Sequence, residues 1–127
     1  MNNEETARAF SSHRFSDAFP QLSPDVRWTI VGHGRLDGLD AVQRACHDTA
    51  AESVGVQTSW LRFISSGPGD VVAVDAIGRY EAADGVSVVS SCDIYEFTDG
   101  NITDITSYAA ELDPDDVAAA HTRLVQP

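Results

Sequence analysis

The sequence predicts an α+β fold in which helices lie on one face of a curved antiparallel sheet. Helical patterns come first along the chain, and a run of strand patterns fills its second half. Asp-Gly pairs at 84–85 and 99–100 separate the later strands, and Asp-Gly is a strong hairpin signal because glycine tolerates positive φ. Strands joined by hairpins are antiparallel neighbours, so the helices are left to cover one face of their sheet.

The first elements along the chain are two helices and a strand. Residues 3–12 form the first expected helix, because Glu4 and Glu5 suit the positive N-terminal end of a helix. The segment FSDAFPQLSPDV is expected to form a short second helix that its prolines close. The segment VRWTIVG is expected to be a short strand.

The clearest amphipathic helix is expected at residues 38–53. Leu39, Val42 and Cys46 recur at helical spacing, with polar residues on the opposite side, and Gly55 ends the pattern. Strands are then expected at 56–64, 71–82, 86–97 and 101–112. The segment 113–124 is the last expected helix, because Asp113 can cap it and Pro114 suits its first position.

Length and charge limit the function. The chain has 127 residues, enough for a single domain spanning 1–127. Its net charge of −12 argues against partners that are nucleic acids or anionic membrane surfaces. No apolar run approaches the roughly 20 residues that cross a bilayer, and the N-terminus lacks a secretion signal. We therefore expect a cytoplasmic protein.

The sequence predicts no metal site and no cofactor. The two cysteines lack CxxC spacing, so each is expected to be a small buried residue. The histidines show no paired metal-binding spacing, and three of them are expected on helix surfaces. The residues concerned are Cys46, Cys92, His13, His47 and His121.

A single charged residue interrupts the strand at 86–97. By alternation, Asp93 shares a face with Tyr95 and Phe97, and these apolar neighbours mark that face as the inner one. A desolvated carboxyl group has a raised pKa, because burial penalises its charged form. The alternative is a structural carboxylate that is bonded to a neighbouring group such as Ser91. We expect Asp93 to face a pocket, and both roles remain open.

Two stretches resemble the nuclear transport factor 2-like superfamily, in its ketosteroid isomerase and SnoaL-like branch. They are DVRWTIVGHGRLDGLDAVQRA, which combines a Trp strand, a glycine loop and a helix start, and CDIYEFTDGNITDITSY, a hairpin with a D-G turn. The resemblance implies a cone-shaped curved sheet wrapped around the N-terminal helices, with a deep apolar pocket and a homodimer joined through the sheets. This fold hosts many enzymes and also non-catalytic modules, so it does not settle the function.

The resemblance also implies a role for Asp93. In ketosteroid isomerases, a D-x-x-x-F strand carries a protonated Asp that donates a hydrogen bond to a developing enolate. Asp93 to Phe97 match that spacing. In this chain, however, the place of the isomerase base falls at Thr29 or Ile30, and the place of its helical Tyr falls at Phe10. We therefore do not expect steroid isomerisation.

Other acid-base candidates are His33 and Asp75. His33 lies in the glycine loop, with an unperturbed pKa near 6.5, and the alternative for it is an exposed loop residue. Asp75 interrupts an apolar strand as Asp93 does, and the alternative is pairing with Arg62 or Arg79 across the sheet. Ala109 and Ala110 stand where SnoaL-like cyclases and epoxide hydrolases often place an acid.

The expected pocket lining is mostly aromatic, with a polar strip beside Asp93. Ordinary core packing is the alternative for each aromatic residue. The expected ligand-binding residues are Phe10, Phe15, Phe19, Trp28, Trp60, Arg62, Ser91, Tyr95 and Phe97.

Two functions are consistent with this pattern. The first is a cofactor-independent isomerase, cyclase or dehydratase that acts on a small apolar molecule with Asp93 as the acid. The second is a non-catalytic ligand-binding or dimeric scaffold module, and the missing base favours it. In both cases we expect an apolar small-molecule ligand. We also expect a homodimer, because an outer sheet face with Val88, Cys92 and Ile94 needs cover.

Overall fold

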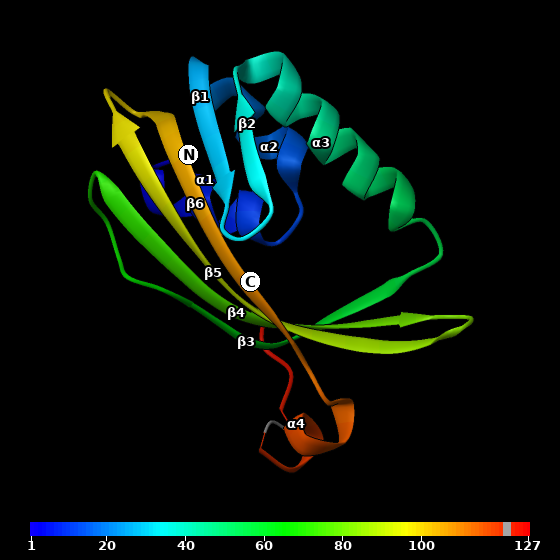
Figure 1. Ribbon diagram of the computed structural model, residues 1–127. Coiled ribbons are helices and arrows are strands. Elements are labelled where there is room, and N and C mark those ends of the chain that lie inside the picture. The colour runs from blue at the N-terminus through cyan, green and yellow to red at the C-terminus, as the bar shows by residue number, and fades with distance from the viewer. Residues whose placement is uncertain (121–122) are drawn as a thin grey trace.

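The fold is a curved sheet with the N-terminal helices and the long middle helix on one face and a short C-terminal helix at one end (Figure 1). The computed structural model describes residues 1–120 and 123–127, so His121 lies outside the described residues. The α+β architecture predicted from the sequence is confirmed. The helical elements are α1 (Asn3–Ser11), α2 (Phe15–Ala18), the 3-10 turn η1 (Phe19–Gln21), α3 (Leu39–Glu52) and α4 (Pro114–Ala120).

In the described part of the chain the sheet has six strands in the order β2-β1-β6-β5-β4-β3. Neighbouring strands are antiparallel, with the exception of β1 and β6, which run parallel. The predicted meander is present as β3, β4 and β5, and the two Asp-Gly turns lead into β5 and β6. The strands are β1 (Leu22–Ile30), β2 (Gly34–Asp37), β3 (Gln57–Ser65), β4 (Val71–Ala82), β5 (Gly85–Thr98) and β6 (Asn101–Leu112).

The β1–β2 hairpin differs from the sequence prediction. β1 begins at Leu22, inside the segment that was expected to be helical. Pro24 is tolerated there because the pairing with β6 is irregular between Leu22 and Arg27, so no regular ladder bond is lost. β2 was expected to be a loop. It is a short strand with a single apolar side chain, and such a strand carries no alternating pattern that could predict it.

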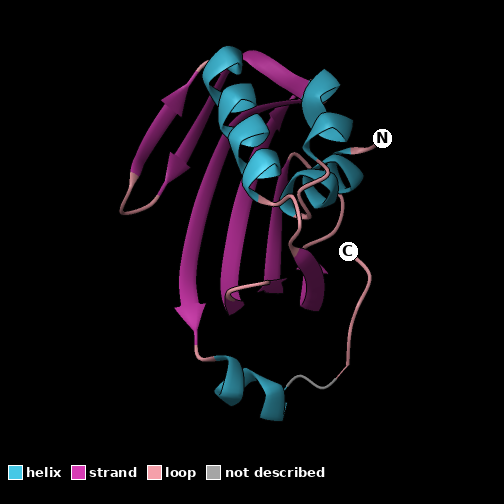
Figure 2. Cartoon of the chain, turned by 90° about the vertical axis from the view of Figure 1, so that its right-hand side faces the viewer, coloured by secondary structure: helices cyan, strands magenta, loops and turns pink. Residues whose placement is uncertain are grey.

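Helices α1, α2 and α3 cover one face of the sheet (Figure 2). α1 starts at a capping box, in which the Asn2 side chain accepts from the Glu5 N–H at 2.8 Å. Arg8 holds the helix on β3, because its guanidinium donates to Ser65 Oγ at 3.0 Å and lies 4.8 Å from the Phe63 ring centre. These contacts fix the position of the turn that follows α1.

The core lies between these helices and the inner sheet face. Val72, Val74 and Ala76 of β4 are buried, and the residues between them are more exposed. This alternation identifies the inner face. The buried residues of the main core are Ala7, Phe10, Phe15, Ala18, Leu22, Val26, Val42, Cys46, Trp60, Phe63, Val72, Val74, Ala76, Tyr95, Phe97, Ile102 and Ile105.

The C-terminal segment covers one end of the outer face and one sheet edge. Val117 of α4 packs with Ile77 and Val88, so Val88 is covered by the chain itself and does not need a partner. Val125 donates its N–H to the Trp60 carbonyl at 2.9 Å, which protects part of the edge strand β3. Among residues 1–120 and 123–127, no helix has the length and apolar character needed to cross a membrane.

Candidate functional site

A cavity of about 250 Å³ lies between the inner sheet face and the helices. Its aromatic side is built around Phe10, whose ring meets those of Phe15 and Trp28 edge to face at 5.0 and 5.1 Å. Its other side carries hydroxyl groups and one carboxyl group. Small-molecule sites usually combine an apolar wall with a few convergent polar groups in this way. The lining residues are Phe10, Ser11, His13, Phe15, Trp28, Ile30, Thr49, Tyr80, Val89, Ser91, Asp93, Ser107 and Ala109.

Asp93 supplies that carboxyl group from the middle of β5. It lies opposite buried Val74 of β4 and Ser107 of β6, which places its side chain on the inner face as alternation predicts. Ser11 Oγ donates to Asp93 Oδ2 at 2.8 Å. Burial raises the pKa of Asp93, and its hydroxyl partners and the charge of His13 offset this effect only in part. The carboxyl group is therefore biased towards its neutral form, which can donate a hydrogen bond.

The hydroxyl groups around Asp93 form a connected network. Ser11 Oγ lies 2.5 Å from Tyr95 Oη, and because the Ser11 proton goes to Asp93, the Tyr95 hydroxyl donates to Ser11. Ser107 lies opposite Asp93 in the paired strand β6. Ser107 Oγ accepts from the Trp28 indole N–H at 2.9 Å, which leaves the Ser107 proton free for Asp93. A connected network of this kind holds the carboxyl group in one orientation.

His13 reaches the same cavity from the turn between α1 and α2. Its ring stacks on Phe15 with centroids 5.3 Å apart and on Tyr80 with centroids 6.0 Å apart, and the Trp60 ring meets it edge-on. Burial of this ring lowers the pKa of His13, and the charge of Asp93 opposes that shift. The residue as a whole remains solvent-exposed, so the desolvation is partial.

The backbone at His13 adopts an unusual conformation for a non-glycine residue. The Arg14 N–H donates to the Ala9 carbonyl at 2.9 Å, the His13 N–H donates to the Phe10 carbonyl at 3.1 Å, and φ of His13 is +67°. This is a Schellman helix end, in which glycine normally takes the left-handed position. A β-carbon in that conformation costs about 1 kcal/mol or more.

A glycine in β4 makes room for the second ring of the stack. A β-carbon on Gly78 would lie 2.6 Å from Tyr80 Oη, 2.8 Å from Tyr80 Cζ and 3.1 Å from a Trp60 ring carbon. The Tyr80 ring therefore lies over the bare backbone of Gly78, where it can meet His13. Burial raises the pKa of Tyr80 to about 12, so its hydroxyl stays neutral.

Some of the residues predicted to bind a ligand lie in the core behind the cavity. Phe10, Phe15, Trp28 and Ser91 line it. Trp60, Tyr95 and Phe97 are buried deeper, and Phe19 lies beside His47 in a neighbouring hollow. The reason is that alternation assigns a side chain to a face of the sheet but does not say which part of that face the helices cover.

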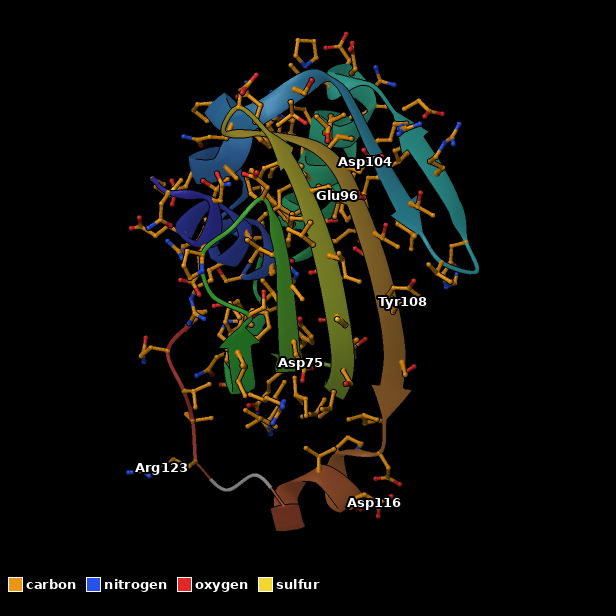
Figure 3. The ribbon with its side chains drawn as sticks, turned by 90° about the vertical axis from the view of Figure 1, so that its left-hand side faces the viewer. Asp75, Glu96, Asp104, Tyr108, Asp116 and Arg123 are labelled. Atoms are coloured by element: carbon orange, nitrogen blue, oxygen red, sulfur yellow. The ribbon has the colours of Figure 1, made fainter. Side chains whose placement is uncertain are left out.

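Asp75 lies on the outer face of the sheet (Figure 3), the face opposite to that of Asp93, and Arg62 is beside it. The expectation that Asp75 could assist Asp93 as an acid-base partner is therefore corrected. Arg62 Nε lies 2.8 Å from Asp75 Oδ2, and both side chains are partly exposed. This is the alternative interpretation of Asp75, a cross-strand ion pair. Arg62, expected to bind a ligand, is its partner.

His33 is also separated from the cavity. It is exposed in the turn between β1 and β2, and the shallow hollow that it lines is a different one. The expectation that His33 could serve as the base for Asp93 is corrected, because the glycine loop extends past the rim of the site. The titratable side chains that line the cavity together with Asp93 are His13 and Tyr80, and neither was expected there from the sequence.

Residues 1–120 and 123–127 contain no group of three or more His, Cys, Asp or Glu side chains that could hold a metal ion. Cys46 is buried in the core, and burial raises the pKa of its thiol to about 12. Cys92 lies on the outer face, partly buried.

The sequence model of the SnoaL-like domain matches residues 4–105. The chain belongs to the SnoaL-like domain family. No curated protein matches the chain. Among solved structures it is similar to an NTF2-like protein of unknown function from Cytophaga hutchinsonii, at 28% identity and a TM-score of 0.71, over 84% of this chain and 98% of that one.

Two further structures show the same fold at lower identity. One is described as a candidate isomerase of the SnoaL-like family from Agrobacterium tumefaciens, with 13% identity, a TM-score of 0.62 and coverage of 84% and 95% of the two chains. The other is an LEH-like epoxide hydrolase from M. tuberculosis, with 18% identity, a TM-score of 0.61 and coverage of 94% and 89%. The SnoaL-like fold predicted from the sequence is thus confirmed.

Positions where SnoaL-like enzymes were expected to carry an acid or base hold alkyl groups in this member. Ile30 lines the cavity at the place of the isomerase base, and Ala109 lines it near the end of the last strand. Phe10 lines it without a hydroxyl group. The hydroxyl group that α1 directs at Asp93 belongs instead to Ser11, the residue after Phe10.

Proposed function

We propose that this SnoaL-like protein binds a small, mainly apolar molecule that carries an acceptor oxygen, and that it catalyses proton transfer on that molecule with Asp93 as the acid. One observation carries the proposal: a carboxyl group lies in an aromatic cavity, hydrogen-bonded to the Ser11 hydroxyl, with its pKa raised by burial. An isomerase, cyclase or dehydratase would each use such a donor.

In its neutral form Asp93 carries a proton that it can donate, whereas the ionised carboxylate carries none. A ligand carbonyl or epoxide oxygen placed beside it accepts that proton or a strong hydrogen bond as negative charge develops on the oxygen. Phe10, Phe15 and Trp28 hold the apolar part of the ligand. The cavity of about 250 Å³ is smaller than the roughly 300–1,000 Å³ that is typical of drug-sized ligands, which favours a compact molecule.

Similar structures support this class of chemistry. Neighbours of the same fold include a candidate isomerase and an LEH-like epoxide hydrolase. The same fold hosts other functions, so the proposal rests on Asp93 and its surroundings.

A second candidate function is ligand binding without chemistry. Ile30 and Ala109 favour it, because they place alkyl groups where related enzymes carry a base or an acid. Among the described lining residues, Asp93 is the sole carboxylic acid.

Hydrogen–deuterium exchange of small cyclic ketones in D₂O tests the proposal. The purified chain should accelerate loss of the α-hydrogen signal in proton NMR, and Asp93→Asn should slow it about 10²- to 10⁴-fold, the usual contribution of a general acid or base. Asp75→Asn is the matched control, because it removes a carboxylate of the outer face. Ketone binding without exchange in the wild type would support the second candidate. Full exchange by Asp93→Asn would remove Asp93 from the mechanism.

We also propose a homodimer formed through the outer sheet face. Ile64, Val71 and Tyr108 are large apolar side chains with 51%, 61% and 48% of their surface exposed. They lie on β3, β4 and β6, on the face that the N-terminal helices leave open, where an apolar surface needs cover. The remaining expectations, a cytoplasmic location and an apolar ligand without nucleic acid or cofactor, stay predictions.

A further inference from the structure

We propose that His13 is the base that works with Asp93, taking the proton from the carbon next to the acceptor oxygen of the ligand. This inference rests on the proposed function, for which it supplies the missing general base. It starts from geometry: the His13 ring and the Asp93 carboxyl group line one cavity from separate elements, the turn after α1 and strand β5. A ligand in the cavity therefore meets both groups.

The ring of His13 is held in place before any ligand arrives. Phe15 and Tyr80 stack on it with interplanar angles of 23° and 15°, and Trp60 meets it edge-on. The absent β-carbon of Gly78 makes room for the Tyr80 ring. A base that is fixed in orientation needs no rearrangement at the moment of proton transfer.

The backbone provides a separate observation. His13 holds a left-handed φ of +67° at a helix end where glycine would be unstrained. Strained backbone conformations cluster at functional sites, because the side chain that imposes the strain is needed there. The contacts of Ser11 with Asp93 and of His13 with Tyr80 come from positions two residues apart at the same helix end.

Electrostatics support an acid and a base in their neutral forms. Burial lowers the pKa of His13 from 6.5 and raises the pKa of Asp93, so each group is biased towards the form that the reaction needs. The other titratable or charged groups facing His13 are Tyr80 of β4, Arg14 of its own turn, and Cys46 and His47 of α3. Tyr80 and Cys46 stay neutral, since burial raises the pKa of each to about 12.

The step balances within these two side chains and the ligand. A ring nitrogen of His13 takes the α-hydrogen as a proton, and the C–H electron pair becomes the C=C bond of an enol. The carbonyl π pair moves to the oxygen, which takes the proton of Asp93. The reverse step returns a proton to carbon and to Asp93, so no other reactant is consumed. In D₂O, exchange of the imidazolium proton with solvent places deuterium on the carbon.

The test uses ketone exchange with two variants of His13. His13→Asn removes the base and keeps a residue that tolerates left-handed φ, and His13→Gly removes the ring from a position that glycine favours. Both should fold and should lose exchange about 10²-fold or more. Imidazole added to His13→Gly should restore part of the rate. His33→Asn, which changes an exposed loop histidine, is the control and should match the wild type.

The pH profile separates a base from a purely structural ring. The wild-type rate should rise with pH as the base His13 loses its proton and fall at higher pH once the acid Asp93 is ionised, a bell-shaped profile. The dependence on His13 ionisation should be absent in His13→Asn. If the wild type exchanges ketones and His13→Asn retains the rate and the pH profile, the inference about His13 is overturned and the proposed function stands. If the wild type exchanges none of the ketones, the proposed function itself fails, and the role of His13 fails with it.

Discussion

The sheet face on which Asp93 lies could be predicted from the sequence, but its hydrogen-bond partners could not. Its position between Cys92 and Ile94 in an alternating strand was enough to place it on the inner face, and the structure confirms that placement. Its hydroxyl partners could not be predicted, since Ser11 and Ser107 come from positions 82 residues before and 14 residues after it in the chain. Those contacts depend on how α1 and β6 are arranged in three dimensions.

His13 could not be predicted as a pocket residue from the sequence. The sequence Ser-Ser-His-Arg at 11–14 contains no glycine, so the usual sign of a Schellman turn is missing. A histidine just beyond a helix end is commonly a surface residue, and the sequence analysis treated it as one. A non-glycine residue at a left-handed position is visible only in the structure, and there it points to a functional side chain.

At the scale of elements, the long strands were predictable and the short hairpin was not. β4 and β5 carry alternating apolar residues and a D-G turn, so their pairing follows from local pattern. β1 contains a proline and lies parallel to β6, a pairing between segments that are distant in sequence. Nothing local specifies that pairing.

Gly78 allows β4 to position the aromatic stack. Gly78→Ala should displace the Tyr80 ring, because the new β-carbon would lie 2.6 Å from Tyr80 Oη and 3.1 Å from a Trp60 carbon. We expect the free energy of unfolding to fall by about 1–3 kcal/mol, as for other overpacked positions. We also expect the pKa of His13 to return towards 6.5. Urea unfolding and NMR titration of the imidazole measure both effects.

Gly85→Ala is the control for that variant. It strains a glycine with φ of +147° at the hairpin end, where nothing lies within 4 Å of the new β-carbon. It should lower stability without changing the pKa of His13. An unchanged His13 pKa in Gly78→Ala would show that the stack does not depend on the position of Tyr80.

At the scale of the whole molecule, the outer sheet face sets the expected assembly. Multi-angle light scattering at micromolar concentration should give the mass of a dimer for the wild type. Tyr108→Arg should shift it towards the monomer, because a charge would be placed in an apolar isologous contact. Val54→Arg, at an 82% exposed site after α3, should leave the dimer intact. A wild-type monomer would contradict the assembly.

The central claim is that Asp93 is a neutral carboxylic acid inside an aromatic cavity. Carbon-detected NMR of the Asp93 carboxyl group across pH, with Asp93→Asn to assign the signal, measures its pKa directly. The account predicts a midpoint above the model-peptide value of about 3.9, because desolvation outweighs the hydroxyl donors. A midpoint at or below that value would contradict it, and would make Asp93 a structural, ionised carboxylate.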